Sequence, residues 1–572
     1  MRFFALFGLT AVLLAQTGPL PRADYGARLE PRGVIQHGAG QDPAAFNRYS
    51  QVMPAAGRPG VYMAYLSLKD LRADWADDFR RRLPFGLSTF VTLQIGLSMT
   101  TDGRPQDSYE ARVADGDFDQ QIRYLVDGLA ALTLPVYLRI GYEFNGLAWN
   151  GYRPEPYRAA FRRIADALRA RPEIPAATVW CAAIDGTRNF EDFYPGDDTV
   201  DLYPIDILTA RHFDDPDVAR FAAAATARRK PLMLGETTPR DVGAQTPGAW
   251  DNWFAPFFRW MAATPALKQF NYINWDWAER GRALNQPGWI TWGDARLETD
   301  LAAPVRQRYI DALSGPTFAH ALTEEEFWRS LGPTDAGGPP PTPQGLDYQS
   351  DAVGGLGLAW QSIDESLTPT AARYSIYRDE ELAGFSLTPN FVDESARAGV
   401  PVSYRIAMMS RAGVLSAPSE PITVTPESIL RCADEFDDPG RWRLDSFQAG
   451  ARGSFALEDS SARLEVQQLS GTNWHLQFRR FVNLHAGHRY RLTIRARADR
   501  AVTVPLWLQQ DGGANAIYHT RMPALSTDWR TFEWEISSPA TTRASLALIL
   551  GALPAGTILW IDSVRCSELP PA

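Results

Sequence analysis

The sequence predicts a (β/α)8 barrel followed by two all-β sandwich domains. Before residue 331, short apolar segments alternate with amphipathic helical stretches, which is typical of a parallel barrel when the unit recurs about eight times. Residues 332–344 are rich in proline and glycine, which excludes a helix or a central strand and indicates a linker. After the linker only strand and turn patterns remain. The alternative for the first part is an open doubly wound sheet, but the sequence lacks the glycine-rich phosphate loop that favours such a sheet.

Length and composition restrict the possible functions. A chain of 572 residues is too long for a single hydrophobic core, so several domains are expected. Hydrophobic residues make up 45% and charged residues 22%, as in ordinary globular proteins. The net charge of −10 and the lack of Lys/Arg runs argue against nucleic acid or an anionic membrane as partners. The 18 tryptophans supply either core packing or platforms for sugar rings.

The N-terminus has the features of an export signal. Arg2 precedes an almost wholly apolar run from Phe3 to Ala15, and a polar break follows. This pattern predicts a signal peptide over residues 1–16, and the run is too short to span a bilayer comfortably. A buried N-terminal helix is the alternative. We therefore expect a secreted protein, extracellular or periplasmic, with no membrane insertion once the signal is removed.

The expected barrel covers residues 24–331, and its elements follow the apolar pattern in chain order. The eight predicted strands are Gly33–His37, Gly60–Leu66, Phe90–Leu97, Pro135–Ile140, Ala177–Ala183, Ile205–Leu208, Pro231–Gly235 and Phe270–Trp275. Helices are expected between the strands, for example over Gln120–Leu132, Pro154–Ala170 and Asp217–Arg229. The second of these helices has apolar residues at helical spacing and arginines on its other face.

Two glutamates follow predicted strands where a barrel carries its chemistry. Glu143 ends the fourth strand and Glu236 ends the seventh, 93 residues later. Catalytic groups of such barrels lie at the carboxyl ends of the strands. Two carboxyl groups facing each other there, roughly 5–5.5 Å apart, suit glycosidic bond cleavage with retention. The simpler interpretations are a surface-loop glutamate for Glu143 and a helix N-terminal glutamate for Glu236, and the apolar residues beside both count against them.

Other residues near strand ends are candidates for substrate contacts. Asp185, Asp206 and Asp276 compete with the two glutamates, and Asp276 is the strongest rival because tryptophans flank it. The residues expected to bind substrate are Asn145, Trp149, Trp275, Trp277, Asp276, Tyr142, Arg139 and His37. Arg139 either holds a carboxylate or forms a buried structural ion pair, and a lone histidine such as His37 more often has a structural role. The cysteine and histidine spacing resembles no metal site, so neither a metal nor an organic cofactor is expected.

A family resemblance rests on three segments: Arg139-x-x-x-Glu143-x-Asn145-Gly-x-x-Trp149, Tyr194-Pro-Gly-Asp-Asp-Thr-Val-Asp201, and Gly235-Glu236. Together they resemble glycoside hydrolase family 26, a family of retaining barrels, over roughly residues 30–315. The resemblance implies that Glu143 is the acid/base and Glu236 the nucleophile.

Three departures from that family put the sugar specificity in doubt. The family usually has histidine before the acid/base, and this chain has Tyr142. Related barrels place an aromatic residue at the end of the sixth strand to orient the nucleophile, whereas here the stretch is Asp206-Ile-Leu-Thr-Ala-Arg211-His212. The eighth-strand segment, Asn271–Trp277, also differs from the mannanase form.

The expected partner is a polysaccharide substrate. β-Mannan is the first expectation, and β-1,3-xylan and mixed-linkage β-glucan remain open. One alternative is an enzyme of the same fold that acts on an α-linked or furanose glycan. Another is a surface glycan-binding protein without catalytic activity.

Residues 345–426 predict a small sandwich. Its strand patterns place Trp360 and Tyr404 where a sandwich core carries a tryptophan and a later tyrosine, which resembles a fibronectin type III domain. Its expected role is that of a spacer.

Residues 430–570 predict a second sandwich with clear alternation of apolar and polar residues. The segments Gly487-x-x-Tyr-x-Leu492, Trp529-x-x-Phe-x-Trp534 and Leu559-Trp-Ile-Asp-x-Val564 resemble family 4/9-type carbohydrate-binding modules. The residues expected to contact sugar are Trp474, Trp507 and Tyr518, each with core packing as the alternative.

The three cysteines have different expected roles. Cys432 and Cys566 lie at the two ends of the second sandwich. Because export permits disulfides, we predict a bond between them that joins the first and last strands. Cys181 lies in an apolar strand and is expected to be an inert buried thiol.

Overall fold

The computed structural model describes residues 21–84, 90–101, 104–184, 189–331, 339–361, 371–410, 414–437, 441–512 and 514–571. The predicted signal peptide, Asp185 and residues 332–338 of the predicted linker lie outside these ranges. None of the helices in the described ranges is long and apolar enough to cross a membrane.

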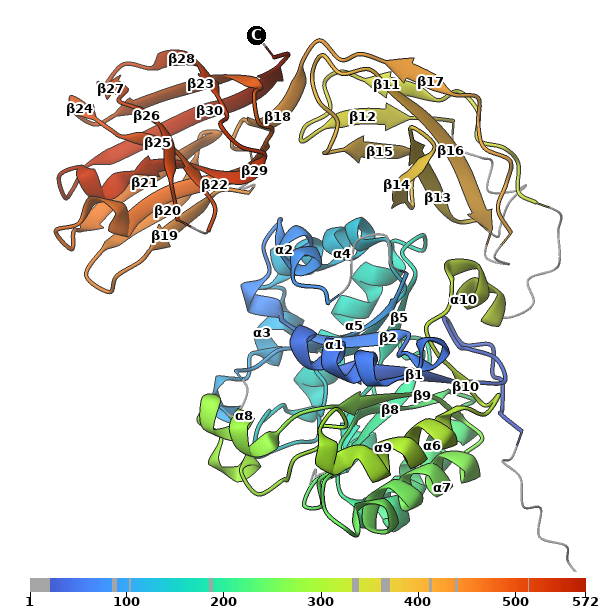
Figure 1. The fold of residues 1–572 in the computed structure, drawn as a ribbon. Helices are drawn as coiled ribbons and strands as arrows, with labels where there is room; N and C mark the ends of the chain where they lie inside the picture. Colours follow the sequence, from blue (N-terminus) through green and yellow to red (C-terminus); the bar gives the residue numbers. More distant parts are fainter. Residues whose placement is uncertain are drawn as a thin grey trace, which may run out of the picture.

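The first part of the chain is the predicted (β/α)8 barrel (Figure 1). Its strands pair in the order β5-β4-β3-β2-β1-β9-β8-β7-β6, and each of these pairings is parallel. They are β1 (Ile35–Gly40), β2 (Val61–Ser67), β3 (Thr92–Ser98), β4 (Val136–Ile140), β5 (Ala176–Val179), β6 (Ala182–Ala183), β7 (Tyr203–Ile207), β8 (Leu232–Thr237) and β9 (Leu267–Ile273). A short strand, β10 (Phe318–Ala319), pairs with the start of β1.

The barrel closes through its fifth strand, which is split in two. β5 pairs with β4 and β6 pairs with β7, and Trp180 and Cys181 separate the two pieces. An isolated parallel bridge between Val179, at the end of β5, and Leu202, just before β7, also helps to close the barrel. When β5 and β6 count as one strand the barrel has eight, so β8, which contains Glu236, is the seventh as predicted.

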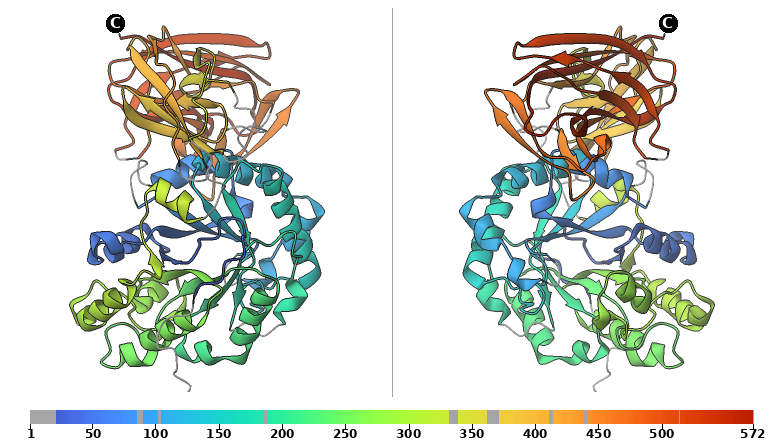
Figure 2. Two further views of the ribbon diagram at one scale, coloured as in Figure 1. Left: turned by 90° about the vertical axis from the view of Figure 1, so that its right-hand side faces the viewer. Right: turned by 90° about the vertical axis from the view of Figure 1, so that its left-hand side faces the viewer.

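Helices surround the strands (Figure 2). They are α1 (Pro43–Val52), α2 (Trp75–Arg81), α3 (Glu110–Asp115), α4 (Asp119–Leu132), α5 (Pro154–Arg169), α6 (Pro216–Ala227), α7 (Ala255–Ala263), α8 (Trp277–Ala283), α9 (Ala303–Leu313) and α10 (Glu324–Ser330). The α5 helix is amphipathic as predicted, since Tyr157, Phe161, Ile164 and Leu168 are buried. Burial of that apolar face against the strands stabilises the helix more than its intrinsic propensity does.

The first sandwich consists of a three-stranded and a four-stranded sheet. One sheet has the order β11 (Asp347–Gln349), β12 (Leu356–Ala359) and β15 (Asn390–Asp393), and the other has β14 (Glu381–Ser386), β13 (Ala371–Arg378), β16 (Val402–Ser410) and β17 (Ile422–Val424). Trp360 and Tyr404 are both buried in its core, and the Tyr404 hydroxyl donates to Oδ2 of Asp393 over 2.6 Å. The sandwich is confirmed, and its fibronectin type III character stays a prediction.

The second sandwich also consists of two main antiparallel sheets. One has the order β20 (Arg452–Glu458), β21 (Ser461–Gln468), β30 (Ile558–Leu569), β23 (Arg489–Ala498) and β28 (Arg530–Ser537), with β18 (Ile429–Asp434) also paired to β30. The other has β19 (Arg443–Ser446), β22 (Leu476–Leu484), β29 (Thr542–Ile549), β25 (Leu506–Gln510) and β26 (Ile517–Arg521). A small ribbon pairs β24 (Val502–Thr503) with β27 (Ala524–Leu525).

The predicted disulfide is wrong in this structure, although the pairing of strands behind it is right. Cys432 and Cys566 are cross-strand partners in β18 and β30, and both are buried. Both are free thiols, so the first and last strands are joined by their backbone pairing and not by a covalent bond. Cys181 is a buried free thiol as predicted.

The three domains contact one another directly. Arg373 of the first sandwich forms an ion pair with Glu324 of α10 and donates to the main-chain oxygen of Thr133 over 3.0 Å. A second group of ion pairs joins carboxylates of the α2 region to arginines of the second sandwich, namely Arg441 to Asp77, Arg443 to Asp74 and Asp78, and Arg543 to Asp78. The sandwiches are therefore docked on the barrel (Figure 1).

Candidate active site

The carboxyl ends of the barrel strands border a cavity of about 520 Å³. This volume lies within the usual range of ligand sites. Three carboxyl groups line it, from Glu143, Asp206 and Glu236. Its aromatic lining residues are Tyr65, Tyr142, Trp149, Trp277, Trp289 and Trp292. The two glutamates predicted from the sequence therefore face a common cavity.

Glu143 lies in the turn that follows β4, in a left-handed backbone conformation with φ 50°. Such a conformation costs free energy for a residue with a side chain, and the surrounding contacts must hold it. The Asn150 side-chain amide donates to the main-chain oxygens of Tyr142 and Glu143, over 2.8 and 3.1 Å. The Trp149 indole donates to Oε2 of Glu143 over 2.6 Å. The turn therefore fixes both the backbone and the carboxyl group of Glu143.

The environment of Glu143 favours its protonated form. Burial raises the pKa of Glu143 well above its usual value, and the nearby carboxylates of Asp206 and Glu236 raise it further. Arg139 and the hydrogen bond from Trp149 act in the opposite direction and do not cancel the rise. A buried carboxylic acid of this kind is what a general acid at neutral pH requires.

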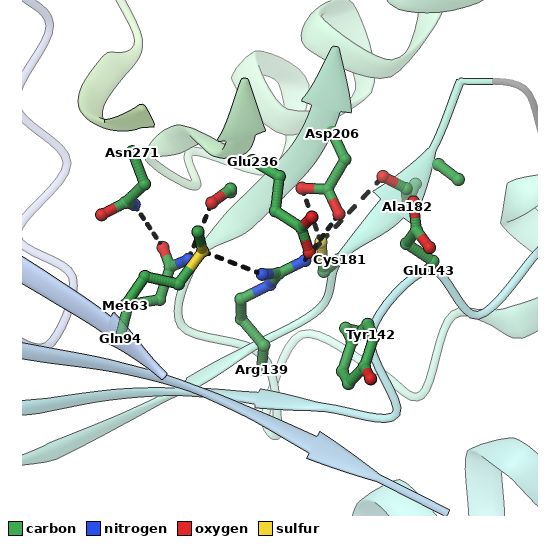
Figure 3. Close-up of polar contacts among 12 residues, drawn as sticks. Met63, Gln94, Arg139, Tyr142, Glu143, Cys181, Ala182, Asp206, Glu236 and Asn271 are labelled. Carbon is green, nitrogen blue, oxygen red and sulfur yellow. Dashed lines mark hydrogen bonds and ion pairs between the residues drawn. The ribbon is translucent and has the colours of Figure 1, made fainter. Parts of the chain in front are cut away.

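Glu236, near the end of β8, is held by a buried arginine. Nη2 of Arg139 donates to Oε1 of Glu236 over 3.0 Å and to Oδ2 of Asp206 over 2.5 Å (Figure 3). The Arg139 side chain is 0% exposed, so its charge must be balanced inside the barrel. Arg139 thus forms the buried ion pair that was one of its two expected roles, and Asp206 and Glu236 are its partners. The Tyr65 hydroxyl also donates to Oε1 of Glu236.

Asp206 was predicted only as a rival to the glutamates, and it lies beside them. Its carboxyl group contacts Arg139, and Sγ of Cys181 lies 3.4 Å from its Oδ1. Burial and the charge of Glu236 raise the pKa of Asp206 to about 8, although Arg139 opposes the rise. Asp206 and Glu236 therefore share one buried guanidinium, and repulsion between these carboxyl groups and the nearby Glu143 favours protonation within the group.

One wall of the cavity is aromatic and carries a cation. The Trp277, Trp289 and Trp292 rings pack against one another, with centroids 4.7 to 6.0 Å apart. The guanidinium of Arg240, four residues after Glu236, lies 4.2 Å from the centroid of Trp292. Flat apolar faces of this kind suit sugar rings. Trp277 was predicted, whereas Trp289, Trp292 and Arg240 were missed because they lie in loops that no strand-end pattern marks.

Two of the predicted contacts have structural roles near the cavity. The Asn145 side-chain amide donates to the main-chain oxygen of Ala183, and its oxygen accepts from the Ala183 main-chain N–H, each over 2.8 Å. These bonds tie the Glu143 turn to β6. Asp276 caps the N-terminus of α8, accepting from the main-chain N–H groups of Ala278 and Glu279. Both residues therefore position the loops around the cavity.

Two other predicted contacts lie away from the cavity lining. Trp275 is buried beneath the guanidinium of Arg280, 4.4 Å from its ring centroid. His37 is not at the end of its strand, because β1 continues to Gly40. Its ring is 0% exposed and bonds the Tyr49 hydroxyl over 2.5 Å and the His320 ring over 3.0 Å. The cleft-lining role expected for His37 is thus replaced by a structural one.

No group of three or more His, Cys, Asp or Glu side chains suited to a metal ion occurs within the ranges that the structure describes. The chemistry of the cavity is that of carboxyl groups, one guanidinium and aromatic rings. Such a set can transfer protons and form a covalent bond to an electrophilic carbon.

Two curated proteins are similar to the chain in sequence. A β-1,3-xylanase named TXYA from a Vibrio species is 27% identical over 338 residues, which cover 54% of this chain and 71% of the relative. A β-1,3-xylanase from an Alcaligenes species is 27% identical over 321 residues, which cover 51% of this chain and 66% of that relative. The chain thus spans about two thirds of the length of these enzymes. No family model matches the sequence.

Solved structures show weaker likenesses. A family 26 β-mannanase from Bacteroides ovatus is 14% identical, with a TM-score of 0.37 and coverage of 53% of this chain and 92% of that one. A family 4 carbohydrate-binding module is 25% identical, with a TM-score of 0.22 and coverage of 24% of this chain and 91% of that one.

The cavity and the curated relatives agree on the class of enzyme. A barrel that brings a glutamate with a raised pKa and an arginine-held glutamate to one cavity, and that is related in sequence to two curated glycosidases, is a glycoside hydrolase.

Proposed function

We propose that the protein hydrolyses a β-linked polysaccharide with retention of configuration, and that β-1,3-xylan is its substrate. The observation that carries the proposal is the contrast between the two glutamates. Glu143 is a partly buried acid with a raised pKa, whereas Glu236 is held by donors from Arg139 and Tyr65. Two carboxyl groups with opposite environments suit an acid/base and a nucleophile.

The proposed reaction has two steps. In the first, a carboxylate oxygen of Glu236 bonds to the anomeric carbon while the bond from that carbon to the leaving oxygen breaks, and Glu143 transfers its proton to that oxygen. In the second, water attacks the anomeric carbon, the ester to Glu236 breaks, and Glu143 accepts the proton of the water. Both groups return to their starting states.

The choice of β-1,3-xylan rests on the two curated relatives, which are named as β-1,3-xylanases and match more than half of the chain. β-Mannan, the first substrate expected from the sequence, is therefore the second polysaccharide to be assayed. The aromatic wall of Trp277, Trp289 and Trp292 is proposed to hold a sugar ring beside the cleaved bond.

We also propose that the second sandwich binds the same polysaccharide. Trp474 and Phe447 are 44% and 42% exposed, and their ring centroids lie 6.0 Å apart. Exposed aromatic rings that lie side by side offer flat apolar faces that suit a sugar ring. Trp507 and Tyr518, on β25 and β26, are only partly buried and stay predicted contacts.

A substrate panel with two variants tests the proposal. Wild type, Glu143→Gln and Glu236→Gln are assayed on β-1,3-xylan, β-mannan and mixed-linkage β-glucan, with released sugars sized. We expect wild type to release oligosaccharides from β-1,3-xylan and each variant to lose at least about a thousandfold in rate. Activity of either variant near the wild-type level would contradict the assigned roles, and release from β-mannan alone would contradict the substrate.

A further inference from the structure

The family resemblance leads us to expect an aromatic residue at the end of the sixth strand, β7, beside the proposed nucleophile Glu236. Leu208 lines the cavity just after that strand instead. We propose that Tyr65, which comes from the second strand, is the positioning residue for Glu236. The inference rests on the proposed role of Glu236 as nucleophile.

The contacts of Tyr65 support this role. Its hydroxyl donates to Oε1 of Glu236 and accepts from Nη1 of Arg139 over 3.3 Å. Nη2 of the same arginine donates to Oε1 over 3.0 Å. Two donors therefore act on one oxygen of the carboxylate, and they fix its orientation. The geometry assigns the other oxygen, Oε2, to the attack on the anomeric carbon.

A glycine on the neighbouring strand makes room for the tyrosine ring. Tyr65 and Gly96 are register partners in β2 and β3. A Cβ atom on Gly96 would lie 2.7 Å from Cδ1 and Cε1 of Tyr65 and 3.1 Å from the ring of Tyr142. Carbon atoms do not approach so closely, so any other residue at position 96 would displace the ring. Position 96 therefore requires glycine, because the Tyr65 ring occupies the space that a side chain would need.

Tyr142 supports the ring from the other side. It stands where the family has histidine, and its ring meets that of Tyr65 edge to face with centroids 5.1 Å apart. The guanidinium of Arg139 lies 5.3 Å from the centroid of Tyr142. The two departures seen in the sequence are therefore related. Tyr142 replaces the histidine before the acid/base, Tyr65 is proposed to take the place of the aromatic residue on the sixth strand, and the two rings contact each other.

The Tyr65 hydroxyl stays a donor over the working range of pH. Burial raises the pKa of Tyr65 well above its usual value, and the charge of Glu236 raises it further. A neutral phenol beside a carboxylate stabilises the ionised form of that carboxylate.

The test is the Tyr65→Phe variant, which removes one oxygen atom and keeps the ring. We expect kcat to fall by about 10- to 100-fold, because a preorganised donor is lost, with KM changed much less. The control is Tyr137→Phe, which removes a buried phenol bonded to Leu29 and Gln36 and should leave kcat near the wild-type value.

A second variant, Gly96→Ala, tests the positioning without removing the hydroxyl. We expect it to lower kcat by displacing the Tyr65 ring, and the double variant to lose less activity than the two single effects combined. An unchanged kcat in Tyr65→Phe would overturn the inference. Glu236→Gln is measured in parallel: if it stays active, the proposed function fails, and if it is inactive while Tyr65→Phe behaves as wild type, only the present inference fails.

Discussion

Trp149 donates its indole N–H to Oε2 of Glu143 over 2.6 Å, within the same turn. The contact joins the two residues that the sequence places six positions apart after the fourth strand. Trp149 therefore orients the carboxyl group that is proposed as acid/base, in addition to the sugar-stacking role expected from the sequence. The bond favours the ionised form of Glu143, against the effects of burial and neighbouring carboxylates.

Replacement of Trp149 by phenylalanine should therefore raise the pKa of Glu143 further. The acid would stay protonated to higher pH, so the basic limb of the pH profile of kcat/KM should move to higher pH, while kcat falls about tenfold or more because the acid is less well oriented. The pH profile on a soluble oligosaccharide provides the measurement. Trp328→Phe is the control, because it removes an indole bond to Glu324 outside the cavity. A basic limb that stays in place or moves to lower pH would contradict the assignment.

Replacement of Asp206 by asparagine should move the same limb in the opposite direction. Asp206 is, after burial, the largest cause of the raised pKa of Glu143. Without its charge the pKa of Glu143 falls, and the general acid loses its proton at lower pH. The profile is compared with that of Asp201→Asn, which removes another arginine-paired carboxylate far from the cavity lining. The same pH limits in wild type and Asp206→Asn would show that Asp206 does not act on Glu143.

The junction between the sandwiches predicts a pH-dependent stability. Glu568 is 0% exposed and accepts from Arg431 and His485, each over 2.9 Å. Burial alone would raise the pKa of Glu568, and these donors lower it to about 2. A lowered carboxyl pKa stabilises the fold above about 4.5, the ordinary value, and this contribution is lost as the pH falls towards 2.

Glu568→Gln should therefore lower the free energy of unfolding by about 3–5 kcal/mol at neutral pH, because Arg431 is left without its buried counter-charge. The difference from wild type should shrink as the pH falls from 5 to about 2, and thermal unfolding scans at several pH values measure it. Glu435→Gln, in an ion pair whose two side chains are 50% and 59% exposed, is expected to cost less than about 1 kcal/mol. An equal loss for both variants would refute the special role of Glu568.

The ion pairs between the barrel and the second sandwich predict a salt-sensitive docking. Asp74 and Asp78 of the barrel both contact Arg443. In the double variant Asp74→Asn/Asp78→Asn the arginine loses both partners, so the sandwich should move away from the barrel. Small-angle X-ray scattering should show a larger radius of gyration than for wild type, and about 1 M salt should shift wild type in the same direction. A radius unchanged by the variant and by salt would mean that other contacts hold the domains.

Much of the barrel follows from the sequence, because its strands are buried on both faces and appear as apolar runs. All eight predicted strands overlap observed ones; β4 ends three residues before Glu143, and β8 ends one residue after Glu236. The errors are local. The first strand was predicted to end at His37, whereas parallel pairing with β9 continues β1 to Gly40. Asp276 has a capping role that its place before a helix, with a side chain that suits an N-cap, would have indicated.

The rest of the site depends on contacts between distant parts of the chain. Tyr65 and Glu236 are 171 residues apart, and their contact requires Gly96 on a third segment. Trp289 and Trp292 reach the cavity from a loop after α8 whose path has no periodic signal. For Cys432 and Cys566 the sequence correctly predicted that the first and last strands pair, but it wrongly predicted a disulfide between two thiols that are free.

In the proposed mechanism Glu236 forms a covalent bond to the substrate while Glu143 supplies the proton. That bond can be trapped with a 2-deoxy-2-fluoro xyloside carrying a good leaving group, and the labelled peptide can be sequenced by mass spectrometry. We expect one sugar per chain, attached to Glu236, and faster labelling of wild type than of Tyr65→Phe. A label on Glu143 or Asp206, or a panel-active enzyme that releases product of inverted configuration and forms no adduct, would contradict this mechanism.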